Sequence, residues 1–172
     1  MRLAVLGIAF ALALGCASVG MLPKSASEIN FSASEGKTGW SAYRQFEMFR
    51  GYSSDQVYDA AKVGLGAAGF SLRKADVNQG FAIGEHGMTA HDWNVIAGVY
   101  FRQEREGTRV AVIVEGSKDI GFSGDVTSGG WGGEILKGMR DYLHRTHQNN
   151  LEGDKALPRR CRPYHRNPGR FI

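Results

Sequence analysis

The stretch that most constrains the fold is residues 93–102, the longest run of alternating residues in the chain. One set of alternating positions holds Trp93, Val95, Ala97, Val99 and Phe101. The other set is apolar enough to indicate that its face is partly covered too, so we expect a central β-strand. A polar turn at residues 104–107 leads to a second alternating run at residues 109–115, and the two runs predict an antiparallel hairpin.

Two amphipathic helices are predicted on either side of these strands. Ser53 and Gln56 have the spacing of a capping box, in which each side chain satisfies a backbone N–H group at the helix start. Gly69 is placed to end this helix. Its apolar stripe contains Val57, Tyr58, Ala61, Gly64, Leu65 and Ala68. The second helix has a stripe of the same spacing, made of Ile135, Leu136, Met139, Tyr142 and Leu143. Both stripes indicate helices with one buried face.

Three further strands are predicted from apolar residues between turn signals: the middle of residues 40–52, and residues 70–74 and 81–85. Helices that bracket antiparallel strands favour an α+β fold. We expect a two-layer sandwich, with an antiparallel sheet of four or five strands and two helices on one face. Gly64 and Gly66 each cost about 1 kcal/mol in a helix interior, so we expect close approach to the sheet at that point.

The N-terminus indicates an export signal. Arg2 precedes an uncharged apolar run over residues 3–14. At about a dozen residues, this run fits the apolar region of a secretory signal and is shorter than the roughly twenty residues that cross a bilayer. We therefore expect residues 1–15 to be removed as a signal peptide.

Residues 12–16 read LALGC and resemble the lipobox of bacterial lipoprotein precursors, although Ala13 stands where leucine is usual. The resemblance implies cleavage before Cys16 and a diacylglyceryl thioether on its sulfur. It also implies a location in the bacterial cell envelope, with the outer membrane facing the periplasm favoured by Ala17 instead of aspartate. The alternative is cleavage by an ordinary signal peptidase after Ala17.

Composition divides the rest of the chain. Residues 16–39 are mostly small and polar, which predicts a flexible tether after the lipidated N-terminus. We expect residues 40–148 to form the α+β domain. The apolar pattern stops at residues 149–172, which predicts a disordered basic tail. Five arginines lie in the last fourteen residues. Removing them and Arg2 from the formal charge of +4 leaves −2, so we expect no nucleic-acid partner.

Potential metal ligands gather at Glu85, His86, His91 and Asp92, but their spacing matches no metal motif, so we expect no metal and no cofactor. Trp93 beside them is more typical of a core residue than of a binding site. Residues 116–133 contain too much glycine for a helix or strand interior and predict a long loop. They lack the ending of a phosphate-binding loop.

These patterns favour a non-enzymatic, lipid-anchored envelope protein that binds or helps to assemble another component. The expected partners are the membrane, through Cys16, and a second envelope protein. No catalytic residue is assigned. The alternative is a small-ligand or metal-binding periplasmic enzyme that uses the loops at residues 86–93 and 121–131. The candidate partner or ligand residues in these loops are His86, His91, Asp92, Trp93, Asp125 and Trp131.

Overall fold

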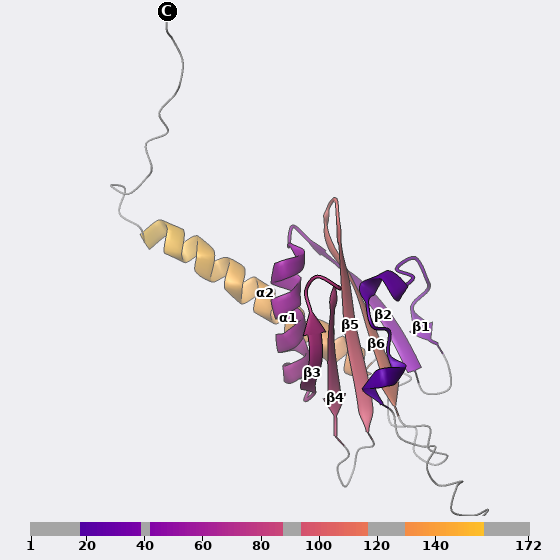
Figure 1. Cartoon of the computed structure of the whole chain (residues 1–172). Helices are drawn as coiled ribbons and strands as arrows, with labels where there is room; N and C mark the ends of the chain where they lie inside the picture. Colours follow the sequence, from indigo (N-terminus) through magenta and orange to yellow (C-terminus); the bar gives the residue numbers. More distant parts are fainter. Residues whose placement is uncertain (1–17, 39–41, 88–93, 117–129, 157–172) are drawn as a thin grey trace, which may run out of the picture.

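The computed structural model describes residues 18–38, 42–87, 94–116 and 130–156, with side chains up to residue 149. It confirms the α+β fold, with an antiparallel sheet that carries two helices on one face (Figure 1). The strands are β1 (Gly36–Lys37), β2 (Ala42–Arg50), β3 (Ser71–Asp76), β4 (Phe81–His86), β5 (Val95–Glu104) and β6 (Gly107–Gly116). The helices are α1 (Ser54–Ala67) and α2 (Gly130–Ala156), preceded by the 3₁₀ turns η1 (Val19–Met21) and η2 (Ala26–Glu28). The described sheet has six strands in the order β1-β2-β6-β5-β4-β3, and the additional strand is the two-residue β1.

The β5–β6 hairpin lies at the centre of the sheet, as the alternation predicts. Its two strands pair along their whole length. The set that includes Val99 and Phe101 packs against the helices, whereas Ile96 and Tyr100 are buried on the opposite face. Both faces of this hairpin are therefore covered. Trp93, expected at its start, lies outside the described residues.

Helix α1 begins and ends at the predicted signals. The Ser53 hydroxyl accepts the N–H of Gln56 at 3.3 Å, and the Gln56 side chain accepts the N–H of Ser53 at 2.9 Å, which completes the capping box. At the other end Gly69 has φ +84°, a left-handed conformation that glycine adopts without a steric penalty. The N–H groups of Gly69 and Phe70 donate to carbonyls of the last turn, as in a Schellman motif.

The close approach expected at Gly64 involves α2 and not the sheet. A Cβ at Gly64 would lie 2.6 Å from the carbonyl oxygen of Ile135 and 2.7 Å from Cγ of Met139. Gly138 faces it on α2, where a Cβ would lie 3.0 Å from Cα of Gly64. The two helices thus cross through a pair of glycines, because a side chain at either position would push their backbones apart.

The expectation of a flexible tether is wrong for residues 18–38, which we call the strap. The strap lies across the sheet face opposite the helices (Figure 1). Its buried side chains are Leu22, Ile29 and Phe31, which form a second core with residues of β4, β5 and β6. Three buried apolar side chains offset part of the entropy lost when such a segment is ordered.

Helix α2 is longer at both ends than the sequence predicts. The glycines at residues 130–133, expected to belong to a loop, lie in its first turn. Gly132 is buried there against the Gln45 side chain of β2, which would have to shift to admit a larger residue. The helix continues to Ala156, so the expectation of a disordered tail is wrong for residues 149–156, and residues 157–172 lie outside the described residues. None of the described helices has both the length and the apolar character that a bilayer-spanning segment requires.

Candidate functional site

Two of the residues selected from the sequence meet at one end of the sheet. His86 is the last residue of β4, and Trp131 lies in the first turn of α2; their ring centroids are 4.8 Å apart. Phe70 packs edge-on against both rings, at 5.8 Å from His86 and 5.3 Å from Trp131. We call these three residues the His86 cluster. It forms where the end of α1, the end of β4 and the start of α2 converge.

Packing determines the environment of the His86 imidazole. Its Nδ1 is buried and has no hydrogen-bond partner within the part of the chain that the structure describes. The neighbouring Glu85 forms an ion pair with Arg73 at 2.9 Å instead. Among the described residues, no group of three or more histidine, cysteine or acidic side chains is arranged to hold a metal ion. The cluster therefore offers aromatic surface and one imidazole nitrogen.

The other selected residues, His91, Asp92, Trp93 and Asp125, lie outside the described residues, as does Cys16. Phe70 was not selected as a site residue. A sequence signal for it exists, because the residue after a C-capping glycine in a Schellman motif commonly makes an apolar contact with the last helical turn.

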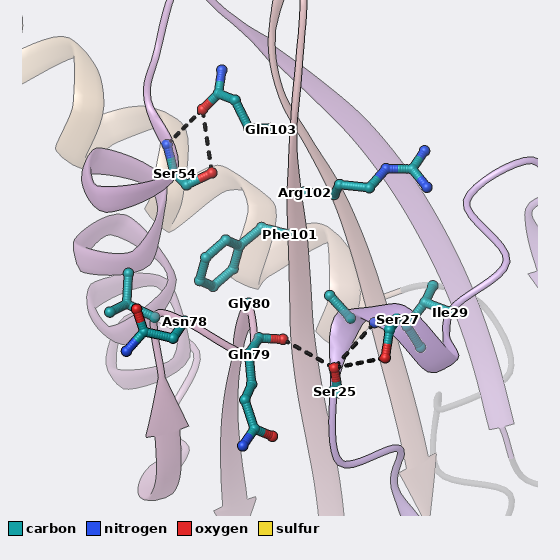
Figure 2. Close-up of a pocket in the computed structure, with 12 residues that line it drawn as sticks. Ser25, Ser27, Ile29, Ser54, Asn78, Gln79, Gly80, Phe101, Arg102 and Gln103 are labelled. Atoms are coloured by element: carbon teal, nitrogen blue, oxygen red, sulfur yellow. Dashed lines mark hydrogen bonds between the residues drawn. The ribbon is translucent and has the colours of Figure 1, made fainter.

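A groove of about 370 Å³ lies nearer the opposite end of the sheet, between the strap and the turn that joins β3 to β4 (Figure 2). We call it the strap groove. Its lining residues are Ser25, Ala26, Ser27, Ile29, Ser54, Val77, Asn78, Gln79, Gly80, Phe101, Arg102 and Gln103. The sequence did not predict this groove, because one of its walls is the strap.

Hydrogen bonds across the strap groove hold the strap and α1 to the sheet. The Gln79 carbonyl accepts the N–H of Ala26 at 2.9 Å and the hydroxyl of Ser25 at 3.4 Å. The Gln103 side-chain oxygen accepts the N–H of Ser54 at 2.9 Å and lies 3.2 Å from its hydroxyl (Figure 2). Many polar atoms of the groove are thus already used within the protein.

Arg102 is the charged residue of the strap groove, and it points away from Phe101 (Figure 2). Its guanidinium contacts the Glu104 carboxylate at 2.9 Å and lies 4.7 Å from the ring centroid of Phe31. Arg102 therefore helps to hold the strap through a cation–π contact. The side chains of Asn78 and Gln79 also line the groove, and their amide groups suit binding through hydrogen bonds.

No known protein family matches the chain, and no curated protein is significantly similar to it in sequence. Several solved structures resemble its fold, among them the following three. Protein MLL2253 from Mesorhizobium loti is 10% identical with a TM-score of 0.46, and the match covers 61% of this chain and 98% of that one. Protein CV1439 from Chromobacterium violaceum is 12% identical with a TM-score of 0.42, covering 60% and 96%.

The third is the di-domain ARO/CYC protein BexL from the BE-7585A biosynthetic pathway. It is 12% identical with a TM-score of 0.33, and the match covers 70% of this chain and 52% of BexL. At these identities and TM-scores, the three likenesses carry no argument about function.

Proposed function

We propose that the protein is a lipid-anchored module of the bacterial cell envelope that binds another envelope component and does not act as an enzyme. The observation that carries this proposal is the apolar run at residues 3–14, whose end overlaps the lipobox-like residues 12–16. The strap supports it, because its packed residues, from Leu22 to Phe31, follow Cys16 closely in the sequence and so join the proposed anchor to the domain. The strap groove supports the binding role, because the amide side chains of Asn78 and Gln79 are among the residues that line it.

The anchor is tested by replacing Cys16 with serine in the full-length chain. Cys16→Ser should abolish labelling by a radioactive fatty acid and release the protein from the membrane fraction, because the thioether requires the sulfur and stable attachment requires two or more acyl chains. An exposed serine elsewhere, Ser32→Ala, serves as the matched control and should leave both readouts unchanged. Equal labelling of the Cys16→Ser and parent proteins would refute the anchor.

The His86 cluster favours a second candidate, a small-ligand or metal-binding enzyme. It brings an imidazole with a buried, unpartnered Nδ1 beside Trp131 within the described residues. Under the leading, non-enzymatic proposal, we expect the purified protein to contain no stoichiometric transition metal. Elemental analysis that finds one metal per chain, lost in both His86→Ala and His91→Ala, would instead make the loops at residues 86–93 and 121–131 the active-site candidate.

A further inference from the structure

The contacts of the strap define the direction in which it runs along the sheet. The Tyr100 hydroxyl donates to the Pro23 carbonyl at 2.8 Å, and its ring lies against Gly98 in the middle of β5. Further along the strap, Phe31 lies under Arg102, nearer the turn between β5 and β6. Rising residue numbers in the strap thus lead toward the β5–β6 turn.

The start of the strap consequently lies toward the other end of the sheet. Val19 packs against the cluster that contains Ile83, and η1 contacts β4. Strand β4 ends there at His86, which is paired with Val95 at the beginning of β5. Figure 1 shows the same arrangement, with the indigo strap rising along the sheet.

The proposed lipid would leave η1 little freedom to move away from the membrane. Only Ala17 separates Cys16 from Ser18, and consecutive Cα atoms are about 3.8 Å apart, so these two Cα atoms are within about 8 Å of each other. An acylated Cys16 lies at the level of the lipid headgroups. The residues of η1, which directly follow Ser18, are therefore held near that level.

The first residues of the strap have the chemistry of a membrane-contact surface. Residues 18–24 contain no carboxylate. Met21 is 49% exposed although it is large and apolar, and Lys24 is exposed three residues later. An exposed apolar side chain with a cation three residues further along suits the boundary between acyl chains and anionic headgroups. The Glu28 carboxylate also lies here and accepts the backbone N–H of Lys24 at 3.3 Å.

We propose that Met21 and Lys24 contact the bilayer and orient the domain, so that the end of the sheet near η1 faces the membrane. This inference rests on the proposed lipid anchor. The β5–β6 turn, about 30 Å away along the ten residues of β5, points into the aqueous space. The strap groove lies toward that end and stays accessible to a partner.

The orientation is tested by fluorescence quenching with the lipidated full-length protein. Met21→Cys and Glu106→Cys, each in a Cys161→Ser background, carry the same environment-sensitive fluorophore. The vesicles contain phosphatidylethanolamine and phosphatidylglycerol with brominated acyl chains. We expect most of the fluorescence at position 21 to be lost and that at position 106, in the β5–β6 turn, to be unchanged. Both substituted side chains are exposed, and circular dichroism verifies folding.

Charge reversal provides a second measurement. Lys24→Glu should reduce quenching at position 21, whereas the matched control Arg105→Glu, in the β5–β6 turn, should leave it unchanged. Mass spectrometry of the lipidated cysteine separates the two hypotheses. Vesicle-bound, lipidated protein with equal quenching at both positions, or none at position 21, would overturn the orientation and leave the anchor intact. A chain without lipid would overturn the proposed function and the orientation with it.

Discussion

Gly64 and Gly66 lie two residues apart in α1, yet their surroundings differ. A Cβ at Gly64 would clash with the backbone of α2, whereas a Cβ at Gly66 would have nothing within 4 Å. Glycine is thus required at the first position by the helix crossing. At the second it only lowers helix propensity, because a glycine loses more backbone freedom on folding than alanine does.

This pair gives a prediction with its own control. Gly64→Ala should lower the free energy of unfolding by about 1–3 kcal/mol, because the added methyl overpacks the crossing. Gly66→Ala should raise it by up to about 1 kcal/mol. Urea unfolding of both variants measures the difference, and two variants of equal stability would contradict the proposed crossing.

Tyr100 connects the strap to the sheet through a buried phenol. Burial raises the pKa of the Tyr100 hydroxyl above its ordinary value, and the Glu28 carboxylate raises it further. The hydroxyl donates to the Pro23 carbonyl at 2.8 Å, which only the protonated form can do. The folded protein therefore holds this proton more tightly than the unfolded chain.

The stability that Tyr100 provides should be complete below the unfolded pKa of about 10 and should decrease as the pH rises above it. In that range the unfolded chain binds fewer protons, so the free energy of unfolding falls by up to about 1.4 kcal/mol per pH unit. Tyr100→Phe should cost about 1 kcal/mol at pH 7 and show a smaller decrease. Urea titrations at pH 7, 9, 10 and 11 test this, and parallel curves would contradict it.

Among the elements of the fold, the strap is the one whose packing its amino-acid composition did not predict. It contributes two residues to the sheet, through β1, and is otherwise held by apolar burial and a few hydrogen bonds. One such bond joins the Glu35 carboxylate to the N–H of Phe46 at 2.8 Å. Most of the strap's stability must then come from its buried side chains.

Phe31→Ala should lower the free energy of unfolding by about 3–5 kcal/mol, since Phe31 is only 2% exposed and its loss leaves a cavity. Met21→Ala is the control within the same segment and should change stability by less than about 0.5 kcal/mol. Thermal and urea unfolding report both. If both variants matched the parent protein, the strap would behave as the tether expected from composition.

Elements defined by local signals could be predicted from the sequence. Ser53 with Gln56 fixed the start of α1, Gly69 its end, and period-two alternation the central hairpin. The strap could not be predicted in this way, because its three buried residues follow no regular period. The partner of Gly64 was missed for a related reason: a glycine shows that something is close but not which element.

The candidate site was predictable only in part. His86 and Trp131 were selected separately, as members of two loops. Their contact depends on how close the end of β4 lies to the start of α2 in space, and this distance cannot be read from the sequence. Four of the six selected residues lie outside the described part of the chain, so the site prediction remains open for them.

At the scale of the whole molecule, Leu143 is the last side chain in the described part of the chain that is buried in the domain. Residues 144–149 of α2 are exposed except for the half-buried Thr146. Ending the chain after Asp154 should therefore leave the thermal midpoint within about 2 °C of the parent, since losing about 1 kcal/mol shifts it by about 4 °C in a domain of this size. A drop of several degrees in scanning calorimetry would show that the removed residues dock on the domain.

The strand order has a consequence for the time course of folding. Strand β2 pairs with β6, so that Phe49 stands opposite Thr108, and the strap packs on residues of β4, β5 and β6. In a chain that emerges N-terminus first, α1 and the β3–β4 hairpin can form from local contacts, but β2 and the strap must wait until residue 116 has appeared. Such late, long-range closure is slow. The strap and β2 would meanwhile expose their apolar residues, which makes the incomplete chain a client for a chaperone.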